Sequence, residues 1–139
     1  MVYLQSFFSE PKAEPYSVAR WQPKGYDYPC IQVLAPFDEC SWPIRKVPQD
    51  EYLELYAAGL RSRRLEVELA VGFLRDRDAT LCCWCSPERQ KGYPKLFCHT
   101  VLIGFLLESR GVPVCYLDGR EKPVWDGEDK EKFLSLVGF

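Results

Sequence analysis

The sequence predicts a single α/β domain spanning residues 1–139, with a mostly parallel sheet and helices on both faces. Three observations lead to this fold class. Short apolar runs of the kind that form strands alternate with stretches of helical periodicity. The chain has the length of one domain and can bury a core without disulfide or metal staples. Its 47% hydrophobic and 27% charged residues are typical of an ordinary globular protein.

The first predicted elements are two strands separated by a long loop. Residues 2–8 are rich in β-formers and predict the first strand. Residues 9–30 contain four prolines and a glycine, which disfavour both helix and sheet, so this segment predicts a loop with a short extended piece at 16–20. Residues 30–35 predict a second strand, which Pro36 ends.

Two amphipathic helices follow the second predicted strand. The first begins near Gln49, with Asp50 placed as its N-cap. Apolar residues recur at helical spacing, at Leu53, Tyr56 and Leu60 in the first helix and at Leu65, Leu69 and Phe73 in the second. Packing against the core accounts for both apolar faces, without a ligand.

The last third of the chain predicts a βαβ unit and a final helix. The expected elements are a strand over 79–85, a helix over 97–110 that Gly111 can end, a strand over 112–117 before the Asp118-Gly119 turn, and a helix over 128–137. A strand, helix and strand in this order form a right-handed crossover, in which the two strands are parallel.

Composition narrows the class of protein. A net charge of -2 argues against binding nucleic acid or an anionic membrane by charge alone. No apolar run approaches the roughly 18 residues of a membrane span, and Met1–Phe8 is too short for a signal peptide. We therefore expect a cytoplasmic protein that does not associate with membranes. In the cytoplasm thiols are normally reduced, so the seven cysteines predict buried small hydrophobes, metal ligands or reactive thiols before disulfides.

Cys98 and His99 are the candidate catalytic residues. In an open parallel sheet, ligands bind beyond the carboxyl ends of the strands, where the following helices begin. Cys98-His99 opens the helix that follows the 79–85 strand. Because a helix N-terminus favours an anion or lowers the pKa of a thiol, Cys98 is the expected thiolate, with His99 as a neighbouring donor or base.

The same stretch also predicts a metal site as an alternative. Strand alternation places Cys83 and Cys85 on one face of the sheet, and Cys82 with Trp84 on the other. If the first face meets the helix start, then Cys83, Cys85, Cys98 and His99 converge, and three thiolates with an imidazole suit Zn²⁺ or an iron–sulfur cluster. Three interpretations stay open: buried thiols beside a ligand-contacting Cys98-His99 pair, a metal site, and nucleophilic cysteine catalysis.

Two segments mix cations with aromatic residues. Residues 86–97 predict a surface loop, or alternatively a lid or a phosphate-contacting loop. Arg20, Trp21, Lys24 and Tyr26 form a second group, of the kind that stacks bases or grips phosphate. A small-molecule anion, a nucleotide or a nucleic-acid end is therefore a candidate ligand, with Trp84 as a further candidate contact.

Several of these segments together resemble an uncharacterised protein family. The segments are 16–20, 34–36, the helix with Tyr52 and Tyr56, 81–83 and Cys98-His99, in this order. Over about residues 1–117 the chain resembles the family called domain of unknown function 488. The resemblance implies a small Rossmann-like α/β domain and candidate site positions at Ser17, Arg20, Cys98 and His99, but no reaction.

The chain departs from that family at two positions of the site. Thr100 stands where family members usually have Arg, and Cys85 stands where they tend to have Glu. The Cys83-Trp84-Cys85 and Cys98-His99 pattern is instead similar to a sibling family, often found in phages, and this similarity implies a metal.

The sequence thus predicts a small-molecule or nucleotide-binding domain with a Cys/His site, in one version a thiol-dependent enzyme. In that version Cys98 is the nucleophile, His99 adjusts its protonation, and Arg20 with the helix N-terminus holds an anionic substrate. The alternative function is a non-catalytic interaction module that holds Zn or iron–sulfur and contacts protein or nucleic acid.

Overall fold

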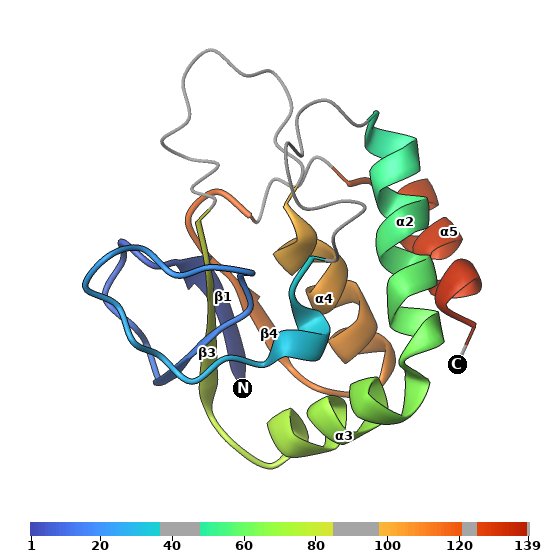
Figure 1. The fold of residues 1–139 in the computed structure, drawn as a ribbon. Helices are drawn as coiled ribbons and strands as arrows, with labels where there is room; N and C mark the ends of the chain where they lie inside the picture. The colour runs from blue at the N-terminus through green and yellow to red at the C-terminus, as the bar shows by residue number, and fades with distance from the viewer. Residues whose placement is uncertain (37–47, 85–97, 121–124, 139) are drawn as a thin grey trace.

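The computed structural model describes residues 1–36, 48–84, 98–120 and 125–138. Its centre is a four-stranded sheet in which every neighbouring pair of strands is parallel. The strands are β1 (Val2–Ser6), β2 (Glu14–Ser17), β3 (Ala79–Cys83) and β4 (Val114–Tyr116), in the order β2-β3-β1-β4 (Figure 1). The predicted α/β class with a parallel sheet is confirmed. Because Ser6 pairs with Cys83 and Ser17 with Cys82, the carboxyl ends of β1, β2 and β3 lie at one edge.

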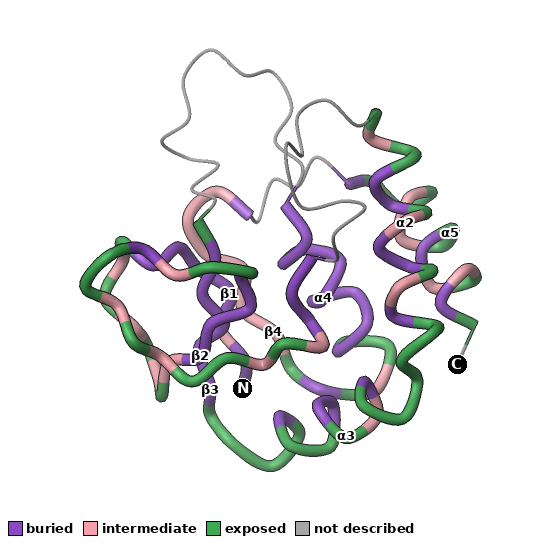
Figure 2. Tube along the Cα trace, viewed as in Figure 1, coloured by how far each residue is buried: buried purple, intermediate pink, exposed green. Residues whose placement is uncertain are grey.

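Four α-helices and one short 3₁₀ helix complete the described part of the fold. They are η1 (Gln32–Leu34), α2 (Gln49–Ser62), α3 (Arg64–Arg75), α4 (His99–Ser109) and α5 (Gly127–Val137). Residues 99–107 of α4 are all buried, because α4 lies between the sheet and the outer pair α2 and α5 (Figures 1 and 2). None of the described helices is long and apolar enough to cross a membrane.

The other face of the sheet is covered by the segment 18–31, which lies across from the helices in Figure 1. A small cluster forms there from buried Phe7, Ala19 and Cys82, with Tyr26 and Tyr28 packed against it. The Phe7 ring stacks on Tyr28 at 6.0 Å and meets the Tyr26 ring edge-on at 5.6 Å. Among the described residues, a loop therefore takes the position on this face that we expected for a helix.

The predicted strand over 30–35 is wrong. Only Cys30 joins the sheet, through an isolated bridge to Ser17, and the chain then turns into η1. The Ile31 amide still donates to the Ser17 carbonyl, but Leu34 donates back to Ile31 and Ala35 back to Gln32. These hydrogen bonds within residues 31–35 take the place of hydrogen bonds to a neighbouring strand, because the short strand β2 ends at Ser17.

The two helices after residue 48 differ in how well their apolar faces were predicted. In α2, Leu53, Tyr56 and Leu60 are fully buried, as expected, although Asp50 lies in the first turn and Pro48 is the N-cap. In α3 the predicted core face is wrong: Leu65 and Leu69 are 78% and 74% exposed, and Phe73 is 38% exposed. The buried residues of α3 are Val67, Ala70, Val71 and Leu74. Both sets have helical spacing, and the smaller side chains of the second set face the core.

Candidate functional site

Two cysteines from different elements meet beyond the carboxyl end of the sheet. Cys83 is the last residue of β3, and Cys98 is the N-cap residue of α4. Their sulfur atoms lie 3.8 Å apart, and both side chains are buried. The structure thus brings together two of the four predicted metal-ligating residues. A third, Cys85, lies outside the described residues, and β3 ends two residues earlier than the predicted strand.

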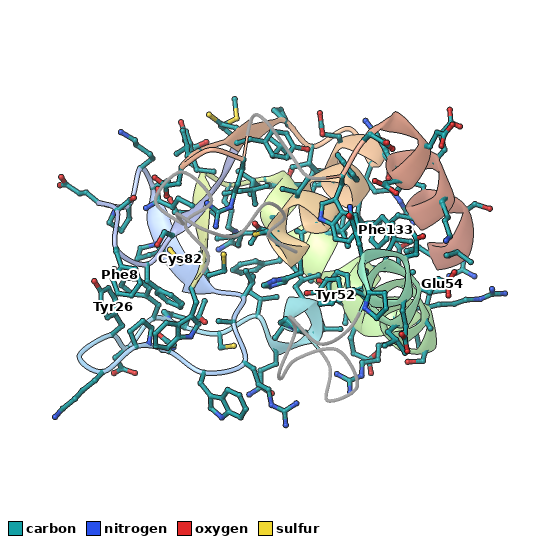
Figure 3. The ribbon with its side chains drawn as sticks, turned by 90° about the horizontal axis from the view of Figure 1, so that it is seen from above. Phe8, Tyr26, Tyr52, Glu54, Cys82 and Phe133 are labelled. Carbon is teal, nitrogen blue, oxygen red and sulfur yellow. The ribbon has the colours of Figure 1, made fainter. Side chains whose placement is uncertain are left out.

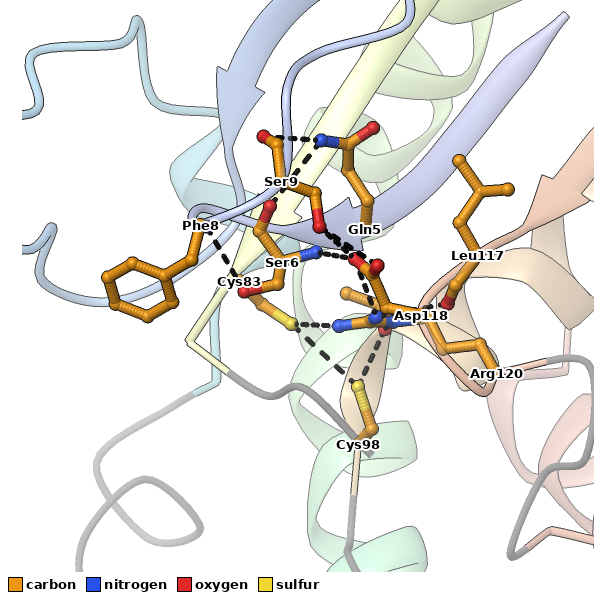
Figure 4. A network of polar contacts seen from close by, with 10 residues as sticks. Gln5, Ser6, Phe8, Ser9, Cys83, Cys98, Leu117, Asp118 and Arg120 are labelled. Carbon is orange, nitrogen blue, oxygen red and sulfur yellow. Dashed lines mark hydrogen bonds and ion pairs between the residues drawn. The ribbon is translucent and has the colours of Figure 1, made fainter. Parts of the chain in front are cut away.

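Arg120 is the cation of this site, and the sequence did not indicate it. Its Nη2 donates to Cys83 Sγ at 2.7 Å and its Nε to Thr100 Oγ1 at 2.8 Å (Figure 4). Its Nη1 donates to the Leu117 carbonyl at 3.2 Å. The guanidinium is almost fully buried, so its charge acts on the two sulfur atoms with little screening by water.

A tight turn after β4 places Arg120. Asp118 and Gly119 both have positive φ, 57° and 89°, which turns the chain back so that the Arg120 amide donates to the Leu117 carbonyl at 3.1 Å. Asp118 fixes the turn to the end of β1: it accepts the Ser6 amide at 2.8 Å and the Ser9 hydroxyl at 2.9 Å. Its carboxylate lies 3.8 Å from Arg120 and partly balances the buried charge.

Polar contacts connect Arg120 to both sulfur atoms. A guanidinium only donates, so the Thr100 oxygen accepts from Arg120, and its own proton can go to Cys98 Sγ at 2.7 Å. A donor therefore points at Cys83 Sγ, whereas Thr100 can either donate to Cys98 Sγ or accept from it. The distance between the two sulfurs fits a hydrogen bond in which either cysteine is the donor.

His99 points away from the cysteine pair. Its Nε2 lies 2.7 Å from the Val18 carbonyl, which can only accept, so this nitrogen carries the proton. The Tyr56 ring packs edge-on against the imidazole at 5.7 Å. Burial is the largest cause that lowers the pKa of His99, which keeps the ring neutral. This geometry gives His99 the role of a core donor and does not place it as a base beside Cys98.

The other predicted ligand-binding residues lie on the loop-covered side of the sheet. Ser17 is buried, and its hydroxyl accepts the Ala19 amide at 3.2 Å within the loop. Trp84 is half exposed, and its indole donates to the Trp21 carbonyl at 2.5 Å. Trp84 contacts Phe8 edge-on, and the guanidinium of Arg20 lies 4.9 Å from the Trp21 ring centre. Figure 3 shows Phe8, Tyr26 and Cys82 on this side, away from Tyr52 and Phe133 in the helical layer.

The part of the chain that the structure describes contains no group of three or more His, Cys, Asp or Glu residues able to hold a metal ion. Cys83 and Cys98 are thus a pair there, without His99. Trp125 was also missed by the sequence reasoning; its indole donates to the Cys98 carbonyl at 3.0 Å and fixes the start of α4. The only sequence signal for Arg120 was its position one residue after the Asp118-Gly119 turn.

We compared the chain with protein-family models, with curated proteins and with solved structures, and none of them matches it.

Proposed function

We propose that this protein is a thiol-dependent α/β domain that binds a small anionic molecule, such as a nucleotide, and reacts with it through the Cys83–Cys98 pair. The observation that carries the proposal is the hydrogen bond from the buried Arg120 guanidinium to Cys83 Sγ. A thiolate is the nucleophilic form of cysteine, and a neighbouring cation lowers the pKa of a thiol. We propose the reducing cytoplasm as its compartment, because both sulfurs must stay reduced.

The geometry favours a different distribution of roles from the one that the sequence predicts. Cys83 is the nucleophile, since it receives the charge-assisted hydrogen bond. Cys98 shares the proton and, at the N-terminus of an 11-residue helix, lies where backbone amides and the helix dipole favour negative charge. Arg120 and this helix end together recognise the anionic group of the ligand, and His99 takes no part in the reaction.

The test is a pH titration of thiolate absorbance near 240 nm. Absorbance suits this site because both sulfurs are buried, so a result does not depend on whether a reagent reaches them. We expect a thiolate that persists below pH 7 and is lost in Cys83→Ala. Cys82→Ala is the matched control, because it removes a buried thiol from the adjacent residue and should leave this signal unchanged. A protein whose first thiol titrates near 8.5 or higher would contradict the proposal.

A metal-bound interaction module is the second candidate, and one distance favours it. Ligand sulfurs of a tetrahedral zinc site, each about 2.3 Å from the metal, lie about 3.8 Å from one another. The Cys83 and Cys98 sulfurs have this spacing. In this version Cys85 is a third ligand, Arg120 donates to a bound thiolate, and the exposed aromatic side chains near Trp84 contact a protein or nucleic acid.

Elemental analysis separates the two candidates. Protein purified without chelator should carry about one equivalent of Zn or Fe if the second candidate holds, and Cys83→Ala should lose it while Cys82→Ala retains it. Less than about a tenth of an equivalent in protein kept from air would rule out the metal-bound module.

A further inference from the structure

The outer face of α3 carries a stripe of large apolar side chains, which we call the α3 stripe: Leu65, Leu69 and Phe73. They are spaced four residues apart, so they lie on one side of the helix, and all three are exposed. The stripe is separate from the thiol site, because α3 leads into Ala79 at the amino end of β3, whereas Cys83 is at its carboxyl end (Figure 1). A contiguous exposed apolar surface is typical of a contact site for another molecule.

Gly72 indicates that this other molecule presents a helix. It lies seven residues after Leu65 and three after Leu69, and therefore on the same side of α3. Its backbone is helical without a positive φ, and a Cβ placed on it would meet nothing within 4 Å among the described residues. Neither conformation nor packing within one chain thus accounts for a glycine, and alanine would favour the helix more. A glycine at an exposed helix face lets a second helix approach the backbone closely.

The α3 stripe is complementary to a second copy of itself. When two α3 helices pack antiparallel around a two-fold axis at Leu69, this residue faces its own counterpart. Leu65 and Phe73 lie four positions on either side of Leu69, so Leu65 of one copy faces Phe73 of the other. Leu65 also lies opposite Gly72 of the other copy, where the missing side chain leaves room for it. One arrangement therefore places every residue of the stripe against an apolar partner.

The charged residues beside the stripe match in the same arrangement. The guanidinium of Arg77 lies 3.5 Å from the centre of the Phe73 ring, and its Nε donates to the Phe73 carbonyl at 2.7 Å. Because Phe73 faces Leu65 of the other copy, Arg77 comes close to Glu66, the residue after that leucine. Glu66 is exposed and lies on the Phe73 side of the stripe. The two-fold axis gives two such pairs of opposite charge, one at each end of the contact.

We propose that this protein forms a two-fold symmetric dimer in which the two α3 helices pack antiparallel along the α3 stripe. A helix of 12 residues is about 18 Å long, so the contact is smaller than the roughly 1,200 Å² of a stable interface. The dimer is therefore weak and reversible, with an expected dissociation constant of about 100 μM. This assembly goes beyond the proposed thiol function and does not depend on it.

Sedimentation velocity of the full chain at about 10 μM and about 1 mM tests the proposal, and we expect mostly monomer at the first concentration and mostly dimer at the second. Leu69→Glu places like charges opposite each other at the two-fold axis and should weaken the dimer at least about tenfold. The side chain of Leu69 is exposed, so the fold should tolerate this change. Trp21→Glu is the matched control, because it replaces an exposed apolar side chain of the loop on the other face of the sheet, and it should dimerise like the original protein.

Charge reversal tests the antiparallel arrangement, and it decides the question if Leu69→Glu does not fold. Glu66→Arg and Arg77→Glu should each weaken the dimer several-fold, and the double variant should restore it, because the opposite charges meet again with their signs exchanged. Three results would overturn the proposal: a protein that stays monomeric at about 1 mM, an equal loss in Trp21→Glu and Leu69→Glu, or a double variant that dimerises no better than the single ones. In the first case the α3 stripe would fit a helix of a different protein.

Discussion

Cys82 and Cys83 are neighbours on one strand, and both are buried, yet their surroundings are opposite in character. Cys82 packs with Phe7 and Ala19 under the loop, where burial raises its pKa to about 12. Cys83 faces the other side, where it meets Arg120 and Cys98. Strand alternation alone separates the two side chains. What each of them meets is decided by segments far away in the sequence, and this difference makes one thiol inert and the other a candidate nucleophile.

Arg120→Met should have the largest effect on stability and on the thiolate signal, because it removes the cation that distinguishes the surroundings of Cys83 from those of Cys82. It removes the donors to Cys83 Sγ, Thr100 and Leu117, and it leaves Asp118 without its cation. Losing one partner of a buried charged network costs about 3–5 kcal/mol, and we expect the free energy of unfolding in urea to fall by about 3 kcal/mol. The thiolate absorbance below pH 7 should disappear as well.

Arg61→Met is the control for that change, since Arg61 is an exposed cation in the last turn of α2. It should leave both the urea midpoint and the thiolate signal close to those of the original protein. A stable Arg120→Met variant that still titrates below pH 7 would show that another group distinguishes Cys83 from Cys82.

Thr100→Val should have the next largest effect. The change keeps the shape of the side chain but leaves Arg120 Nε without its acceptor and Cys98 Sγ without its hydrogen-bond partner Thr100. A buried donor left unsatisfied costs about 1–3 kcal/mol, so we expect a loss of about 2 kcal/mol in urea unfolding and a raised thiol pKa.

Thr80→Val is the matched control for Thr100→Val. Thr80 is equally buried, and its hydroxyl also makes two hydrogen bonds, both to Ala13. This variant should lose stability without moving the thiolate titration. If both threonine variants shift the titration equally, the chain of donors from Arg120 to Cys98 does not set the charge on sulfur.

Local sequence patterns predicted most of the elements, and the failures at 30–35 and in α3 were decided by the segments against which these residues pack. The sheet strands at 2–6 and 79–83 and the helices α2 to α5 follow from short-range periodicity. The segment 30–35 is apolar enough for a strand, but β2 is too short to pair with more than Cys30. In α3 two apolar stripes compete, and packing against η1 buries the one that the sequence analysis did not choose.

The site was predictable only in part, because two of its contacts join residues that are far apart in the sequence. Cys83 and Cys98 meet because a strand end and the next helix start share one edge of a parallel sheet, which the order of elements predicts. Arg120 reaches Cys83 from 37 residues away, through the direction of one turn. His99 bonds to Val18 across 81 residues. No local pattern encodes either contact, so neither the cation nor the direction of the histidine side chain could be predicted from the sequence.

Cys82→Ala should change the pH dependence of stability, and this effect should be smaller than the stability losses of the Arg120 and Thr100 variants. Burial raises the pKa of Cys82 from the ordinary 9.0 to about 12 in the folded protein. The neutral thiol therefore stabilises the folded state in full below pH 9, and this stabilisation is lost as the pH rises toward 12. At pH 10 the loss is about 1.4 kcal/mol. The stability gap between the original protein and Cys82→Ala in urea unfolding should therefore shrink by about that amount from pH 8 to pH 10. A constant gap would mean that Cys82 is not held neutral by burial.

The smallest expected effect is the pH dependence of stability that comes from His99. Burial holds His99 neutral, as it does Cys82, even though His99 is the next residue after Cys98. Because its pKa in the folded protein is below the ordinary 6.5, its contribution to stability is present above pH 6.5 and is lost as the pH falls. The loss is at most about 1.4 kcal/mol at pH 5.5. His99→Gln can keep a donor for the Val18 carbonyl and removes the titrating group, so its urea midpoint should change less than that of the original protein between pH 7.5 and pH 5.5. Its thiolate titration should be unchanged, because the imidazole does not bond to either sulfur. A shifted thiolate titration in His99→Gln would show that His99 influences the charge on the sulfurs. The surroundings of Cys82 and Cys83 would then not explain the difference between the two thiols without His99.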